Sequence, residues 1–163
     1  MQMSSSLSTR LHYQHKSIMN IVEGLSDEQI RRQVITGKWS IFENIVHLQT
    51  YQHVFIERIK QLLDGNNPSF ERYSAEADPM FLENCGLSSR EILHDLITTR
   101  KKMSVEMPKL PETDFEKTAK HPVYGELNLL EWLEFFLLHE AHHLYTIFRL
   151  GANLKQQLEP SPV

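Results

Sequence analysis

The chain of 163 residues has one cysteine, few glycines and no long run of uncharged apolar residues. Its single cysteine, Cys85, cannot form an internal disulfide, which favours a reducing, cytoplasmic location. The most apolar segment, 129–150, is interrupted by three acidic residues and three histidines, so we expect no membrane-spanning helix. Residues 1–6 contain no basic stretch followed by an apolar run, so no signal peptide is expected either.

The chain also lacks a strong excess of either charge. It has 17 lysines and arginines against 21 acidic residues, a formal net charge of -4, and these charges are interspersed. Without a basic stripe, a nucleic-acid partner is not expected. The length predicts a single domain, which we place at residues 1–151, followed by a polar tail at 152–163.

Four amphipathic helices are predicted, over residues 6–23, 40–64, 88–107 and 128–150. Ser40 and Ser88 are each followed three residues later by glutamate, the pattern of a capping box that begins a helix. The segment from Ser26 to about Val34 begins with the same pattern and predicts a short helical turn. Gly151 is the predicted end of the last helix.

These helices and the absence of a strand signal predict an all-α fold, a four-helix bundle of the up-and-down type. Two connecting segments, 65–87 and 108–128, are long for such a bundle. We expect them to pack as lids or to contain short additional helices.

Two histidines in the last helix, His139 and His143, are four residues apart and therefore lie on one helix face. If the helices alternate in direction, the helices at 40–64 and 128–150 begin at the same end, and His47 comes close to this pair. Three neutral imidazoles suit a divalent ion such as zinc or nickel and leave coordination positions open for water or substrate. The alternative is that the histidines are ordinary core residues.

Glu140 completes a His-Glu-x-x-His pattern, in which a glutamate next to a zinc ion serves as a general base. The alternative, an ordinary helix acid, is favoured because no third histidine follows at the metzincin spacing. No catalytic residue is therefore assigned. His12 and His15 are expected close enough to support the metal site.

Connecting segments 24–39 and 108–128 are expected to cover the metal site. They would present Lys38, His121 or Tyr124 to a substrate.

Two segments resemble the DinB/YfiT-like family of metal-dependent proteins. Lys38-Trp-Ser-Ile-Phe-Glu-Asn-Ile-Val-His47-Leu is similar to that family's W-S-x-x-E-x-x-x-H-L signature. The segment that ends in His139-Glu-Ala-His-His143 is similar to its closing H-x-x-x-H helix. The resemblance implies a four-helix bundle, often dimeric, with a metal bound by His47, His139 and His143.

The resemblance leaves three functions open. The first is a thiol-dependent S-transferase in which the metal activates a low-molecular-weight thiol. The second is a metal-dependent hydrolase that uses a metal-bound water, and the third is a non-catalytic metal-binding protein. A homodimer is expected because the last helix is apolar nearly all round.

Overall fold

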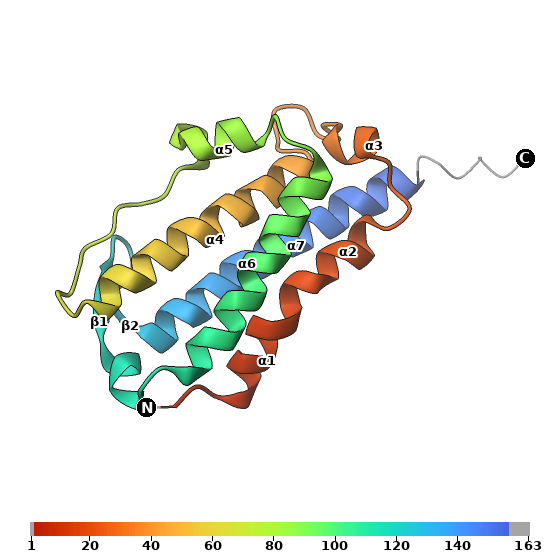
Figure 1. Ribbon diagram of the computed structural model, residues 1–163. Coiled ribbons are helices and arrows are strands. Elements are labelled where there is room, and N and C mark those ends of the chain that lie inside the picture. Colours follow the sequence, from red (N-terminus) through yellow and green to blue (C-terminus); the bar gives the residue numbers. More distant parts are fainter. Residues whose placement is uncertain (1, 157–163) are drawn as a thin grey trace, which may run out of the picture.

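The computed structural model describes residues 2–156 and contains four long rods of helix with a small hairpin at one side (Figure 1). The helices are α1 (Ser5–Tyr13), α2 (Ser17–Val22), α3 (Asp27–Arg31), α4 (Ile41–Leu63), α5 (Pro79–Asn84), α6 (Ser89–Glu106) and α7 (Leu129–Gln156). The strands are β1 (Thr118–His121) and β2 (Gly125–Asn128), and short 3₁₀ turns lie at Gln14–Lys16, Ala75–Ala77, Met107–Lys109 and Glu112–Glu116. The predicted four-helix bundle is confirmed, with α1 and α2 together forming one rod. In the described residues, no helix is long and apolar enough to cross a membrane.

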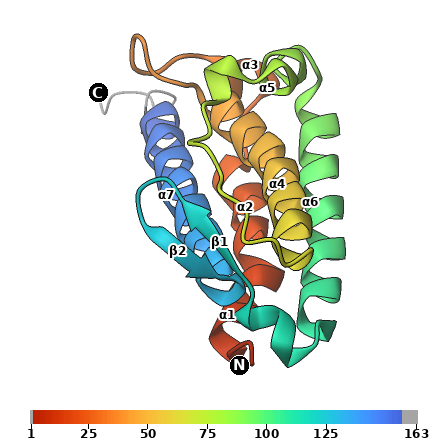
Figure 2. The same ribbon diagram turned by 90° about the vertical axis from the view of Figure 1, so that its left-hand side faces the viewer.

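The four rods do not alternate strictly in direction. Side-chain pairs between α4 and α6 rise together in residue number, so these two helices are parallel. Pairs between α4 and α7 run in opposite order, so α7 is antiparallel to α4. Figure 2 shows how this arises, because the segment after α4 returns along the length of the bundle before α5 and α6. The helices α4 and α7 therefore begin at opposite ends, contrary to the alternation expected from the sequence.

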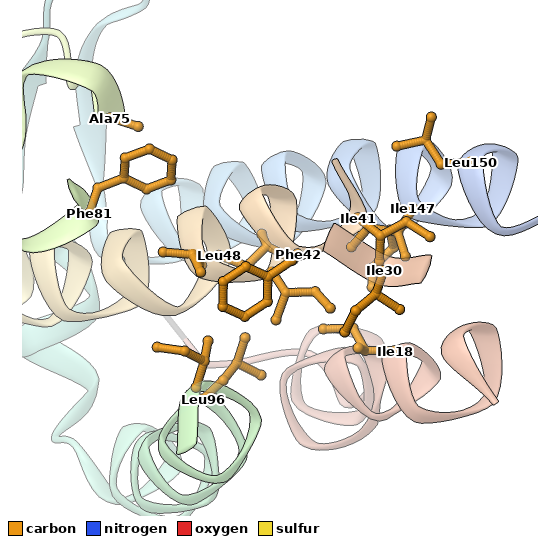
Figure 3. Packing of buried hydrophobic residues seen from close by; sticks show 14 of the residues in the cluster. Ile18, Ile30, Ile41, Phe42, Leu48, Ala75, Phe81, Leu96, Ile147 and Leu150 are labelled. Carbon is orange, nitrogen blue, oxygen red and sulfur yellow. The ribbon is translucent and has the colours of Figure 1, made fainter. Parts of the chain in front are cut away.

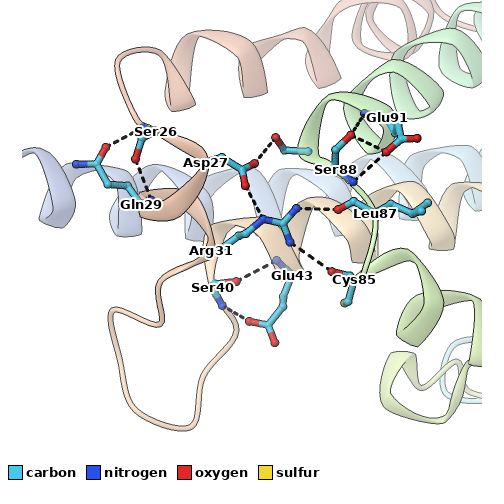
Figure 4. A network of polar contacts seen from close by, with 11 residues as sticks. Ser26, Asp27, Gln29, Arg31, Ser40, Glu43, Cys85, Leu87, Ser88 and Glu91 are labelled. Carbon is cyan, nitrogen blue, oxygen red and sulfur yellow. Dashed lines mark hydrogen bonds and ion pairs between the residues drawn. The ribbon is translucent and has the colours of Figure 1, made fainter.

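Three capping boxes define where helices begin, as predicted. The hydroxyls of Ser26, Ser40 and Ser88 each accept a backbone N–H bond, and the glutamine or glutamate three residues later bonds back to the serine N–H. Figure 4 shows that the end of α3 is tied to the start of α6, because the Arg31 guanidinium donates to the carbonyl of Leu87 at 2.7 Å. These caps determine the register of α4, and thus the position of the residues that follow.

The first rod is not the continuous helix predicted over residues 6–23. A 3₁₀ turn at Gln14–Lys16 separates α1 from α2, and the Ser17 hydroxyl donates to the Gln14 carbonyl there. Such a side-chain bond to the backbone competes with helical pairing, which accounts for the interruption. The following turn, α3, ends at Arg31 rather than near Val34.

The last helix continues past its predicted end at Gly151. That glycine is buried inside α7, and a Cβ atom there would lie 3.5 Å from the Ile21 carbonyl oxygen of α2. Leu154 is fully buried three residues later, so packing extends the helix to Gln156. The remainder of the predicted tail, residues 157–163, lies outside the described residues, and the division at residue 151 stays a prediction.

The two long connections contain additional secondary structure. Segment 65–87 includes α5, in agreement with the expectation of short extra helices. Segment 108–128 forms the antiparallel hairpin β1–β2, so the expectation of no strands is wrong. The strands are only four residues long, too short for an alternating pattern to be recognised, and Gly125 allows the turn between them through a φ of +76°.

The buried apolar residues form two clusters along the bundle axis. One cluster, part of which is shown in Figure 3, contains Ile41 and Ile147 near α2 and α3. The other contains Phe55 and Phe136 near α1 and the hairpin. In α4 the first cluster ends at Leu48 and the second begins at Tyr51, so His47 lies close to the place where the two clusters meet.

Candidate metal centre

Helix α4 supplies His47 at a position determined by its own N-terminal cap. The Ser40 hydroxyl accepts from the Glu43 N–H at 3.1 Å, and the Glu43 carboxylate accepts from the Ser40 N–H at 2.7 Å. Asn44 precedes His47 by three residues and thus lies on the same face of the helix. Both side chains are buried and point toward α7, where they meet histidines.

Helix α7 supplies His139 and His143, one turn apart on the face that packs against α4. Their ring centroids are 4.7 Å apart. The centroid of the His47 ring lies 5.1 Å from that of His139 and 4.4 Å from that of His143. Although α4 and α7 begin at opposite ends, they cross so that the three rings meet. The predicted proximity of His47, His139 and His143 is therefore observed.

The spacing of the three imidazoles suits a single metal ion. One nitrogen from each ring can be chosen so that all lie within 4.8 Å of one another, and His47 Nε2 is 3.1 Å from His139 Nε2. Tetrahedral coordination with bonds of about 2.0–2.1 Å places two nitrogen ligands about 3.4 Å apart. Only small side-chain adjustments separate the observed arrangement from a three-histidine site.

Asn44 determines which ring nitrogen of His143 is free to bind a metal ion. Its Nδ2 donates to the Ser40 carbonyl at 2.8 Å, and this bond directs Oδ1 at His143 Nδ1, 2.9 Å away. An amide oxygen accepts only, so Nδ1 of His143 carries the proton and Nε2 has a free lone pair. Histidine ligands of metal sites are commonly held by such an acceptor on the other ring nitrogen.

Burial keeps all three imidazoles neutral. It lowers the pKa of His47 to about 3, that of His139 to about 4 and that of His143 to about 2, and the neighbouring histidines add to each shift. Nδ1 of His47 and Nδ1 of His139 have no hydrogen-bond partner among the described residues. Neutral imidazole is the form that binds metal.

Aromatic rings surround the three histidines. The Trp39 ring centroid lies 5.0 Å from that of His47, and the Tyr51 centroid lies 4.6 Å from that of His139. Tyr73, from segment 65–87, contributes a ring 5.7 Å from His47. These rings lower the polarity around the histidines.

Two cavities, each of about 460 Å³, open on the histidines from different sides. The first, called the hairpin cavity, is lined by His47, Tyr51, Arg58, Glu71, Arg72, Tyr73, His121, Val123, Tyr124, Phe135 and His139. The second, called the Trp39 cavity, is lined by Ile35, Gly37, Lys38, Trp39, Asn44, Glu76, His142, His143, Thr146 and Leu150. A larger groove of about 980 Å³ between α4, α5 and α6 contains none of the three histidines. A third, more open cavity of about 570 Å³ beside Leu138 also reaches His139. We associate the chemistry with the hairpin and Trp39 cavities, because between them they are lined by all three histidines.

Glu140 is turned away from the three histidines. Its carboxylate is 1% exposed and accepts from the Arg100 guanidinium at 2.5 Å and from the Gln14 amide at 2.9 Å. It ties α7 to α6 and to the 3₁₀ turn at Gln14–Lys16, and Arg100 also donates to Gln52 of α4. The structure thus favours the interpretation of Glu140 as a structural acid over that of a general base.

Of the other residues singled out from the sequence, some line the two cavities and others lie apart from the histidine cluster. Lys38 lines the Trp39 cavity, and His121 and Tyr124 line the hairpin cavity, all next to the histidines. His12 lies beside Tyr13, and the buried His15 is close to Arg100; neither is part of the histidine cluster.

Sequence reasoning missed the roles of Asn44 and Tyr73. Asn44 could have been recognised by its spacing of three residues before His47 on a helix. Tyr73 had no such signal, because its segment returns along the bundle without a regular period.

Comparisons with known proteins agree with this architecture. The family model described as "DinB superfamily" matches residues 10–147. The "Uncharacterized protein YuaE" of Bacillus subtilis (strain 168) is 30% identical, over 77% of this chain and 85% of its own length. A protein of Oceanobacillus iheyensis named "Putative metal-dependent hydrolase OB0782" is 27% identical, over 82% of this chain and 77% of its own.

A solved structure is also similar. YfiT from Bacillus subtilis is described as "a probable metal-dependent hydrolase with an unusual four-helix bundle topology". It aligns with a TM-score of 0.78 at 19% identity, covering 94% of this chain and 91% of its own. At this identity the likeness establishes the fold.

Proposed function

The chain belongs to the DinB superfamily, and from that premise we propose that it is an enzyme whose His47, His139 and His143 bind one divalent ion, zinc or nickel. The observation that carries the proposal is the convergence of three neutral imidazoles from two helices, with Asn44 fixing the tautomer of one. The names of two relatives, both called metal-dependent hydrolases, support the metal requirement. When bound, such an ion would act as a Lewis acid and lower the pKa of a coordinated thiol or water.

For the reaction itself, we propose transfer of a low-molecular-weight thiol to an electrophilic small molecule. The support is the pair of cavities, because two reactants can approach the histidines from different sides. His47 and His139 face the hairpin cavity, while His143 faces the Trp39 cavity. The rings of Trp39 and Tyr51 pack against the histidines, and this apolar surrounding favours attack by the thiol over hydrolysis.

The second candidate is a metal-dependent hydrolase, favoured by the names of the relatives. One experiment separates the two. Zinc-loaded protein is incubated with an electrophile, chlorodinitrobenzene, and with an ester panel, each with and without cysteine as the thiol. We expect protein-dependent formation of a thiol conjugate when cysteine is present, and its loss in His143→Ala but not in His94→Ala, a control at an exposed histidine of α6. Ester cleavage that needs no thiol would replace the transferase proposal by the hydrolase, and no turnover by metal-loaded protein would contradict both.

We also propose that the protein is a cytoplasmic homodimer. Three apolar side chains of α7 on one face, Leu138, Tyr145 and Phe148, are each more than half exposed. Their spacing of seven and three residues places them on one stripe of α7. Such a stripe on the surface of a helix is typical of an association site. The lone thiol Cys85 is compatible with a reducing compartment.

A further inference from the structure

The wall of the hairpin cavity contains a positively charged side chain, Arg58, that forms no ion pair with the residues around it. The Arg58 guanidinium is half-buried in the cavity wall, with its Cζ 5.2 Å from the Phe70 ring centroid and 6.0 Å from that of Tyr51. Its Nη2 donates to the Glu71 carbonyl at 2.7 Å. Within residues 2–156, Arg58 forms no ion pair with a carboxylate. A half-buried charge with aromatic neighbours and spare N–H donors is suited to bind an anion.

The charges of the whole cavity point the same way. Arg72 is exposed at the lining and adds a second positive charge, against one carboxylate from Glu71. Apart from the three histidines and the tyrosines, the remaining titratable side chain of the lining is His121. Burial and the charge of Arg58 lower the pKa of His121, so it stays neutral. The cavity therefore has a positive balance although the chain as a whole is negative.

Arg58 is also placed at a useful distance from the histidines. Tyr51 lies between them, with its ring 4.6 Å from that of His139 and 6.0 Å from the Arg58 guanidinium carbon. One aromatic ring thus separates the anion-binding end of the cavity from the histidine end. A small molecule with two functional groups can span that gap.

We propose that the substrate entering the hairpin cavity carries a carboxylate or phosphate group, that Arg58 binds this group with help from Arg72, and that the reacting atom is thereby positioned at His47 and His139. This inference rests on the proposed function, which supplies the metal. It adds that Arg58 determines which thiol or acceptor is accepted. Arginine is suited to this task because its planar N–H donors match the geometry of both anions.

The test compares two thiols that differ in charge. Mercaptosuccinate carries two carboxylates, and thioglycerol carries none. Dissociation constants for both are measured by calorimetry with zinc-loaded wild type, Arg58→Gln, Arg72→Gln and Arg149→Gln at constant ionic strength. Arg149 is the matched control, because its guanidinium carbon lies 5.9 Å from the ring of Tyr145 outside the cavity.

We expect wild type to prefer mercaptosuccinate by roughly 10-fold or more, as charge-assisted hydrogen bonds provide. Arg58→Gln should lose this preference while binding thioglycerol as wild type does. Arg72→Gln should lose part of it, and Arg149→Gln none. Competition by succinate or by inorganic phosphate then identifies which anion the cavity accepts.

Equal affinity of wild type for the two thiols would overturn the inference, as would an unchanged preference in Arg58→Gln. If Arg58→Gln does not fold, Arg72→Gln decides by the same comparison. Metal content, measured on the same samples, separates this result from the proposed function. Protein that binds no zinc contradicts the metal proposal, whereas succinate binding that depends on Arg58 in metal-free protein would still support the anion site.

Discussion

Replacing Asn44 by alanine should weaken metal binding without removing a ligand. The side chain is buried and links the Ser40 carbonyl to Nδ1 of His143 through bonds of 2.8 and 2.9 Å. Without it, the imidazole can rotate or change tautomer, and the correct form must be selected when the metal binds. Loss of such an acceptor typically reduces metal affinity by roughly 10- to 100-fold, which corresponds to about 1.4–2.7 kcal/mol.

The assay is a competition between the protein and a chromophoric zinc chelator. Asn84→Ala is the matched control, because Asn84 donates to Gln49 at 2.8 Å in a part of α5 that does not touch the histidines. Thermal melts in the presence of EDTA report the cost of the lost bonds to the apoprotein, about 1 kcal/mol per bond. The affinity ratio, corrected for any unfolded fraction, isolates the effect on the site.

Zinc binding by Asn44→Ala as tight as that by wild type would show that Asn44 does not fix the tautomer of His143. An equal loss in Asn84→Ala would likewise show that the effect reflects general destabilisation. A loss well beyond 100-fold would mean that Asn44 contributes more than orientation.

Three further predictions concern stability and assembly. Burial and the charge of Arg100 lower the pKa of His15 to about 3. Between pH 6.5 and 3, the His15 imidazole is therefore protonated only in the unfolded chain, and the free energy of unfolding falls as the pH falls. His15→Leu should therefore reduce the slope of the free energy of unfolding between pH 6 and 4 by up to about 1.4 kcal/mol per pH unit, measured by urea denaturation in metal-free protein. Arg100→Met should destabilise the metal-free protein by about 3–5 kcal/mol, because it leaves the buried carboxylate of Glu140 unpaired, and Arg100→Met combined with Glu140→Leu should recover most of this loss. Sedimentation should show a dimer for wild type and a monomer for the double variant Tyr145→Ser/Phe148→Ser.

Each of these has a clear contrary result. An unchanged pH slope in His15→Leu would mean that this histidine titrates normally in the folded protein. A double variant no more stable than Arg100→Met would show that the ion pair is not the source of the loss. A wild type that sediments as a monomer at high concentration would contradict the dimer.

The long helices were predictable because their signals are local. Ser40 and Ser88 carry capping boxes whose reciprocal bonds depend only on residues three apart, and both helices begin where predicted. The proximity of His139 and His143 is equally local, since it follows from helix geometry alone. His47 met this pair although the assumed helix directions differ from those observed.

What sequence reasoning missed depends on contacts between distant segments. Gly151 has the character of a helix end, but the packing of Leu154 and the close approach of α2 extend the helix. The literal His-Glu-x-x-His match left the role of Glu140 open, and its partner Arg100 is 40 residues away in the chain. The cavity that gives Arg58 a role is built partly by segments 65–87 and 108–128, whose course no local pattern in the sequence indicates.

The most direct test of the central claim is the metal content of untagged protein purified without added metal. Elemental analysis is applied to wild type, His143→Ala and the neighbouring control His142→Ala, before and after reconstitution with zinc or nickel. We predict about one ion per chain in wild type and in His142→Ala, and little in His143→Ala. Absence of metal from all three after reconstitution, or equal metal in all three, would contradict the assignment of His47, His139 and His143 as a metal site.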